Sequence, residues 1–143
     1  EPRGTLLHID FLNNSLTKIL DTFLARVVIG ELRILSHLLK IENGRANGVP
    51  REERICRLCH IEIEDEYHFT CKCPTYAEIR AKYQDILGPS PTLSKVLDTP
   101  DIKRLGRYIL ELKQHREDKL QSVNHNHLNI HQHVTNIIFQ EQG

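Results

Sequence analysis

Three cysteines and one histidine near the middle of the chain have the side chains and the spacing of a metal site. Their order is Cys56-x-x-Cys59, followed by His68 and Cys73. Thiolates and imidazoles are the usual ligands of tetrahedral structural zinc, in which four protein ligands leave no position for water. The spacing therefore predicts one structural zinc ion bound by these four residues, without a catalytic hydroxide.

The same spacing says how the chain between the ligands must fold. A Cys-x-x-Cys pair places both sulfurs on one side of a tight turn, at about 2.3 Å from a shared zinc. His68 and Cys73 can converge only if the residues between them form about one helical turn, which Asp65 can cap. Cys71 is an alternative ligand in place of His68 or Cys73. His60 is expected at the surface or beside the ligands.

Two disulfides are the other interpretation of the four cysteines. Four cysteines in 143 residues are too few for a disulfide-stapled mini-domain, and the first residues do not resemble a signal peptide. Bound zinc in a reducing, intracellular compartment, nuclear or cytoplasmic, fits better.

The composition limits the classes of protein to consider. With 19 basic and 19 acidic residues the net charge is zero, which argues against a strong autonomous nucleic-acid binder. No apolar run approaches the roughly 20 residues that a membrane helix needs. The chain lacks methionine and begins Glu1-Pro2-Arg3, so we expect an excised piece of something longer.

Charge is unevenly placed along the chain. Six basic residues around the zinc turn are candidate phosphate contacts: Arg33, Lys40, Arg45, Arg51, Arg54 and Arg57. The acidic block Glu62-Ile63-Glu64-Asp65-Glu66 lies inside the zinc loop. The alternative interpretation is a mixed, solvated surface.

Helical periodicity surrounds the metal motif. Apolar residues from Leu16 to Val28 have helical spacing, and a second series runs from Leu32 to Ile41 and ends at Asn43-Gly44. Gly30 either separates two helices or lies within a single one, since a glycine there costs only about 1 kcal/mol.

Three further helices are expected after the zinc loop. One opens with the capping box Thr75-x-x-Glu78, one spans residues 92–97, and one begins at Thr99-Pro100. The sequence thus predicts a mainly α fold, a small helical domain with an embedded zinc knuckle and at most a short β-hairpin near Ile61. The expected organisation is a lead-in over 1–12, a zinc-binding domain over 13–120 and a polar, His-rich tail over 121–143.

Several segments together resemble a known family. They are Arg26-Val27-Val28-Ile29-Gly30-Glu31-Leu32-Arg33, Pro50-Arg51-Glu52-Glu53-Arg54-Ile55-Cys56-Arg57-Leu58-Cys59, Glu64-Asp65-Glu66-Tyr67-His68-Phe69 and Cys73-Pro74-Thr75-Tyr76. The chain resembles the zinc-binding tail that follows the polymerase domain in non-LTR (LINE-type) retrotransposon reverse transcriptases. The likeness covers roughly residues 26–112 and is most specific at the centre.

The resemblance implies a function and the partners that go with it. It implies a non-catalytic module, excised or domesticated, that contacts template RNA or target DNA beside a reverse transcriptase and its preceding polymerase domain. No paired-aspartate signature of a polymerase or endonuclease is visible in the sequence. The alternative is a domesticated module that binds a protein partner through the acidic block or an apolar groove, without nucleic-acid binding.

Overall fold

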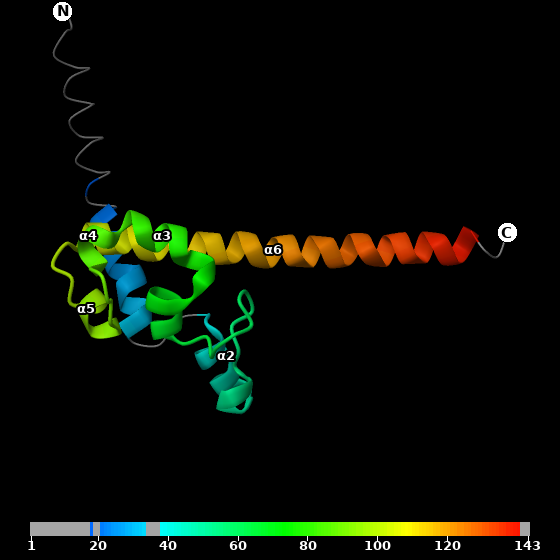
Figure 1. The fold of residues 1–143 in the computed structure, drawn as a ribbon, viewed down its shortest axis with the longest axis horizontal. Helices are drawn as coiled ribbons and strands as arrows, with labels where there is room; N and C mark the ends of the chain where they lie inside the picture. Colours follow the sequence, from blue (N-terminus) through cyan, green and yellow to red (C-terminus); the bar gives the residue numbers. More distant parts are fainter. Residues whose placement is uncertain (1–17, 19–20, 34–37, 141–143) are drawn as a thin grey trace, which may run out of the picture.

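The fold is built from short helical elements around one longer helix (Figure 1). The structure, a computed structural model, describes residue 18 and residues 21–33 and 38–140, with side chains to residue 124. Residues 21–33 are helical, and the elements that follow are α2 (Lys40–Ala46), the 3₁₀ turn η1 (Arg51–Glu53), the π-helical turn η2 (His68–Lys72), the 3₁₀ turn η3 (Pro74–Tyr76), α3 (Ala77–Lys82), α4 (Gln84–Leu87), α5 (Leu93–Leu97) and α6 (Ile102–Gln140).

β-structure in the described part of the chain is limited to one isolated antiparallel bridge between Ile55 and Ile63. It lies where alternation around Ile61 predicts a short strand. The prediction of a mainly α domain with at most a short hairpin is therefore confirmed.

The first half of α6 contributes buried apolar residues to the core. Four of its residues, all on one helical face, are almost completely buried: Leu105, Tyr108, Ile109 and Leu112. They belong to the same apolar cluster as Val28, Ile29 and Leu32 of helix 21–33 and as Phe69 and Tyr76 beside the cysteines. Helix 21–33, α6 and the candidate metal site therefore share one apolar core.

Helix 21–33 and α6 approach each other most closely at Gly106. A Cβ atom on this glycine would lie 2.3 Å from the Cβ of Ala25. An ion pair between Lys113 and Glu31, at 2.5 Å, flanks the contact. Helix 21–33 therefore packs directly against α6. Leu35, in the apolar series that precedes the zinc loop, lies outside the described residues.

Of the two alternatives for Gly30, the structure has the one in which it lies within a helix, and the predicted helix end at Asn43-Gly44 is wrong. The first helix passes through Gly30 and remains helical to residue 33. Helix α2 likewise includes Asn43-Gly44 and ends at Ala46, where Gly48, with φ of 68°, supplies the left-handed residue that follows many helices. The side chain of Arg54 packs against Gly44 and leaves no room for a Cβ, so a larger residue would not fit at this place in the helix.

The helix starts also differ from those the sequence predicts. No capping box forms at Thr75, because Pro74–Tyr76 make a 3₁₀ turn and α3 begins at Ala77 without a side-chain cap. At α6 the cap is Asp101 rather than Thr99: its Oδ1 accepts the backbone N–H of Arg104 at 3.1 Å. Thr92 does cap α5, so the helix expected over 92–97 is confirmed.

Helix α6 continues well past the predicted start of a flexible His-rich tail at residue 121. Its backbone is helical to Gln140. Residues 107–140 contain no glycine or proline, so the sequence offers no strong local stop. The lead-in over 1–12 lies outside the described residues. Among the helices that the structure describes, none combines the length and the hydropathy of a membrane span.

Candidate metal centre

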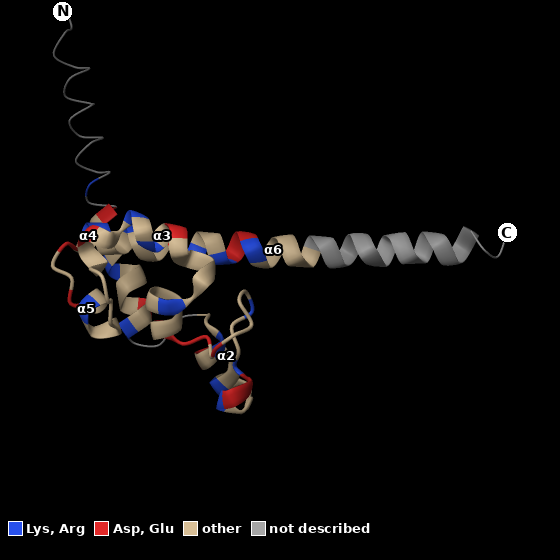
Figure 2. Ribbon diagram, viewed as in Figure 1, with Lys and Arg blue, Asp and Glu red and all other residues tan. Residues whose placement is uncertain are grey.

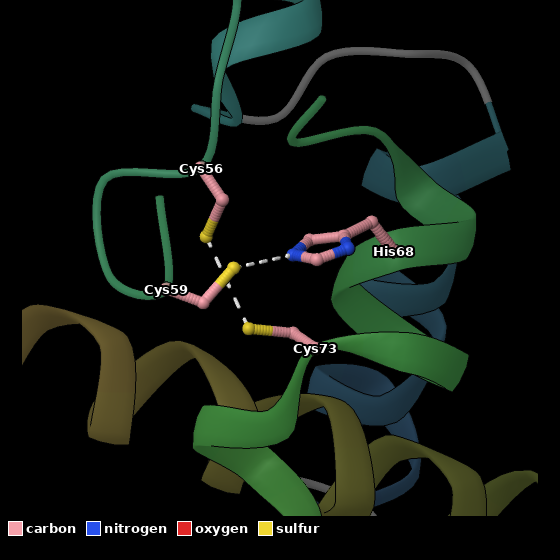
Figure 3. Close-up of side chains that lie close together, drawn as sticks. All are labelled: Cys56, Cys59, His68 and Cys73. Carbon is pink, nitrogen blue, oxygen red and sulfur yellow. Dashed lines mark hydrogen bonds between the residues drawn. The ribbon is translucent and has the colours of Figure 1, made fainter. Parts of the chain in front are cut away.

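The four predicted ligands converge on one point (Figure 3). Their ligand atoms all lie within 4.8 Å of one another, and all but the half-buried Cys59 are buried. The Sγ atoms of Cys56 and Cys73 are 4.0 Å apart, and Cys59 Sγ lies 3.3 Å from His68 Nε2. A tetrahedron with arms of 2.3 Å has edges of about 3.8 Å. The four side chains can therefore bind one metal ion with small adjustments.

A tight turn brings the first two cysteines together. The backbone N–H of His60 donates to Cys56 O at 3.0 Å, and that of Cys56 donates to Glu62 O at 2.8 Å. His60 itself adopts a φ of 58°, the left-handed conformation that reverses the chain after Cys59. Its side chain is exposed, as expected, and the predicted Cys-x-x-Cys turn is confirmed.

A single π-helical turn brings His68 and Cys73 to the same point. Asp65 Oδ1 accepts the backbone N–H of His68 at 2.8 Å, so Asp65 caps the turn as predicted. The N–H of Cys73 then donates to His68 O at 2.7 Å, a five-residue closure. Such wider turns are rare and often occur at functional sites. The expected single turn is present, in π rather than α form.

Cys71 lies outside this cluster. Its Sγ is 3.3 Å from the hydroxyl oxygen of Thr70, and it lines a different cavity together with Arg80. Burial raises the pKa of its thiol. All four cysteines are free thiols in the structure, without a disulfide. The geometry thus favours the ligand set that contains His68 and Cys73.

The thiols of Cys56 and Cys73 differ in their pKa values. The hydrogen bond with Cys73, reinforced by burial, raises the pKa of Cys56 to about 12. The same hydrogen bond lowers the pKa of Cys73 to about 7. Of these two sulfurs, Cys73 is therefore the closer to the thiolate form, and thiolate is the form that binds metals.

Three carboxylates of the acidic block, the block suggested above as one route to a protein partner, make contacts within the protein. Glu62 Oε1 accepts from Lys72 Nζ at 2.9 Å, and this contact lowers the pKa of the Glu62 carboxyl. Glu64 is only 1% exposed and is paired with Arg116. Asp65 caps the π-helical turn. These three carboxylates stabilise the fold around the metal centre.

Three of the six predicted phosphate contacts are engaged within the protein. Arg54 donates its Nε to Val49 O at 2.9 Å and its Nη1 to Ile41 O at 3.0 Å. Arg33 donates to the carbonyl of Leu97. Arg45 lies 3.0 Å from the carboxylate of Glu42. Arg54 in particular is a structural residue, a role that its position in a run of charges did not indicate.

The remaining basic residues divide between two places. Lys40 and Arg57 line one groove of about 280 Å³ between α2 and α6, together with Asn43, Arg116, Glu117, Gln121 and Asn124. Arg51 lines a separate hollow beside His68. Basic and acidic stretches both occur along the described helices (Figure 2). The six residues thus divide among contacts within the protein and two separate hollows.

Sequence reasoning missed two residues near the site. Arg116 contributes the buried partner of Glu64 from α6, and Glu62 Oε2 lies 3.5 Å from His68 Nδ1. The role of Arg116 does not follow from spacing, because it depends on a contact between segments 52 residues apart, and the role of Glu62 depends on how the loop between the ligands folds. The four clustered ligands define a closed site that can hold one metal ion. No protein-family model, curated protein or solved structure matches this chain.

Proposed function

We propose that this chain is a zinc-stabilised, non-catalytic module that contacts RNA or DNA beside a reverse transcriptase. The observation that carries the zinc assignment is the convergence of Cys56, Cys59, His68 and Cys73. Thiolate ligands favour zinc over the hard cations magnesium and calcium, and a closed set of four is typical of structural zinc.

Zinc in this position would tie the turn with Cys56 and Cys59 to the turn that follows it in the loop. Without metal, the cysteine turn joins the rest of the described chain through the Ile55–Ile63 bridge, backbone hydrogen bonds and the packing of Cys56 in the apolar core. His68 is the first residue of η2 and Cys73 follows its last residue, and η2 packs on α6. Zinc-binding free energies of about 10–16 kcal/mol in finger peptides act as folding free energies. The metal is thus expected to order the whole central loop.

The groove that contains Lys40 and Arg57 is the surface we assign to nucleic acid. Both cations can contact phosphates, and the amides of Asn43 and Asn124 can donate hydrogen bonds to phosphate oxygens. The carboxylate of Glu117 on the same groove limits the attraction. Weak binding with little sequence preference follows, because phosphate contacts carry no base information. The resemblance to reverse-transcriptase tails supports RNA or DNA as the ligand.

Fluorescence anisotropy with a labelled single-stranded RNA and a labelled duplex DNA tests this assignment on the zinc-loaded chain. Two phosphate contacts predict an affinity that falls about tenfold between roughly 50 and 200 mM salt. Lys40→Glu combined with Arg57→Glu should remove most of the binding to both ligands. The matched control, Arg45→Glu with Lys95→Glu, makes the same charge change outside the groove and should have a smaller effect. Absence of binding at low salt would contradict the nucleic-acid assignment.

A protein-binding module is the second candidate, and one observation favours it. Phe23, Leu24 and Val27 are 61, 46 and 40% exposed on helix 21–33. Exposed apolar patches of this kind often mark interfaces. A defined partner that binds the wild-type chain but not Phe23→Lys, together with flat nucleic-acid titrations, would favour this function.

A further inference from the structure

The two ring nitrogens of His68 lie in different surroundings. Nε2 faces the cysteines, 3.3 Å from Cys59 Sγ. Nδ1 is buried and makes no hydrogen bond, and Glu62 Oε2 lies 3.5 Å from it. That separation is longer than a hydrogen bond and short enough for a strong electrostatic contact.

Metal binding by Nε2 determines where the imidazole proton must be. A neutral imidazole has one nitrogen with a lone pair and one N–H, so a metal on Nε2 places the proton on Nδ1. A buried N–H without an acceptor costs about 1–3 kcal/mol. Histidine ligands of metals therefore usually donate their second N–H to a carboxylate, a carbonyl or a water.

Glu62 is held in position for this task from two sides. Its Oε1 accepts from Lys72 Nζ at 2.9 Å, which leaves Oε2 toward His68. Its backbone carbonyl accepts the N–H of Cys56 at 2.8 Å. His68 and Lys72 are the first and last residues of η2. One residue thus contacts the cysteine turn and both ends of the turn that carries the histidine.

We infer that Glu62 is the positioning residue of the metal centre. Its carboxylate accepts a hydrogen bond from the Nδ1–H of His68 and so keeps Nε2 directed at the metal. This inference rests on the proposed zinc binding. It gives the half-exposed Glu62–Lys72 pair a role beyond a surface ion pair, which by itself would contribute little. Loss of such an acceptor typically lowers metal affinity 10- to 100-fold.

Competition with a chromophoric chelator measures the zinc affinity of the full chain and its variants. Glu62→Ala should bind zinc about 10- to 100-fold more weakly, and Glu62→Gln, which keeps an acceptor oxygen, should fall between it and the wild type. Glu53→Ala is the matched control: it removes the same charge from the exposed turn η1 and should leave the affinity within about twofold of the wild type.

Nitrogen-15 NMR of His68 in the zinc-loaded chain provides a readout that general destabilisation does not mimic. The wild type should show zinc on Nε2 and a slowly exchanging proton on Nδ1, and Glu62→Ala should show faster exchange of that proton. If Glu62→Ala does not fold, the zinc affinity and the exchange of the Nδ1 proton are measured on Glu62→Gln instead.

Four outcomes would overturn the inference. Equal zinc affinity for Glu62→Ala and the wild type would refute it while leaving the zinc site intact. An equal loss of zinc affinity in Glu53→Ala would also refute it, as would NMR data that place zinc on Nδ1 of His68. A wild-type chain that binds no zinc would refute the proposed function as well, so the two failures are distinguishable.

Discussion

Glu64 and Arg116 form a two-point ion pair inside the protein, although 52 residues separate them in sequence. Arg116 Nε donates to Glu64 Oε1 at 2.7 Å, and Nη2 donates to Oε2 at 3.0 Å. The same carboxylate accepts the N–H of Lys40 at 2.8 Å, and the Glu64 carbonyl accepts the N–H of Ile41 at 3.0 Å. One residue of the metal loop thus connects α2 to α6.

We predict that breaking this pair from either side is costly. Arg116→Met leaves the Glu64 carboxylate buried without its cation, and removing one partner of a buried pair costs about 3–5 kcal/mol. Urea denaturation of the zinc-loaded chain measures the loss. Arg107→Met is the control: it removes an exposed arginine of α6, the helix that carries Arg116, at 3.9 Å from Asp21 of helix 21–33. It should cost less than about 1 kcal/mol. Equal midpoints for both variants would contradict the prediction.

The ligand set makes a direct prediction about metal content. The purified chain should carry one zinc ion, and Cys56→Ser, Cys59→Ser and Cys73→Ser should each weaken or abolish its binding, because a hydroxyl is a poor replacement for a thiolate. Cys71→Ser is the control and should retain the metal, since its sulfur lies outside the cluster. Elemental analysis after dialysis against a weak chelator checks all four variants, and loss of zinc from Cys71→Ser would show the ligand choice to be wrong.

The contact between helix 21–33 and α6 can be tested with a pair of glycines. Gly106→Ala places a methyl group 2.3 Å from the Cβ of Ala25 and should destabilise the protein by about 1–3 kcal/mol. Gly30→Ala meets no atom within 4 Å and should stabilise it by about 0.5–1 kcal/mol through helix propensity. Thermal denaturation with opposite signs for the two variants is the expected result; the same sign would argue against this packing.

The apolar side of the same interface makes a separate prediction. Leu105 is buried in the core, so Leu105→Ala should open a cavity and cost about 2–5 kcal/mol. Leu110→Ala, on the exposed side of α6, is the control and should have a much smaller effect. Denaturation midpoints that do not distinguish these variants would mean that α6 does not share the core.

Arg54 and Arg57 should behave differently despite their closeness in sequence. Arg54→Ala removes the donors that bind the carbonyls of Val49 and Ile41 and should cost about 1–3 kcal/mol of stability. Arg57→Ala should leave the unfolding midpoint within about 0.5 kcal/mol, because its side chain is exposed, and should weaken nucleic-acid binding instead. The two measurements together separate a structural arginine from a phosphate contact.

Local patterns predicted much of the domain correctly. The ligand spacing, the Asp65 cap and the helix over 92–97 depend on residues only a few positions apart, so short-range geometry determines them. The helix limits were less predictable. Gly44 lies within α2, where the side chain of Arg54 leaves no room for a Cβ, and Asp101 rather than Thr99 caps α6. The contact of Gly44 with Arg54 joins residues ten positions apart, and Thr99 and Asp101 both belong to residue types that favour N-caps, so local propensity did not decide either place.

The sequence by itself determined the chemistry of the centre, since the types and spacing of Cys56, Cys59, His68 and Cys73 suffice to predict a closed metal site. Only the tertiary structure decided what the charged residues around it do. Glu64 is buried because α6 brings Arg116 to it, and Glu62 faces His68 because the loop folds back on η2. A charge in a sequence has no partner until distant segments pack together, and the low dielectric of that packed interior makes an unpaired charge too costly to keep.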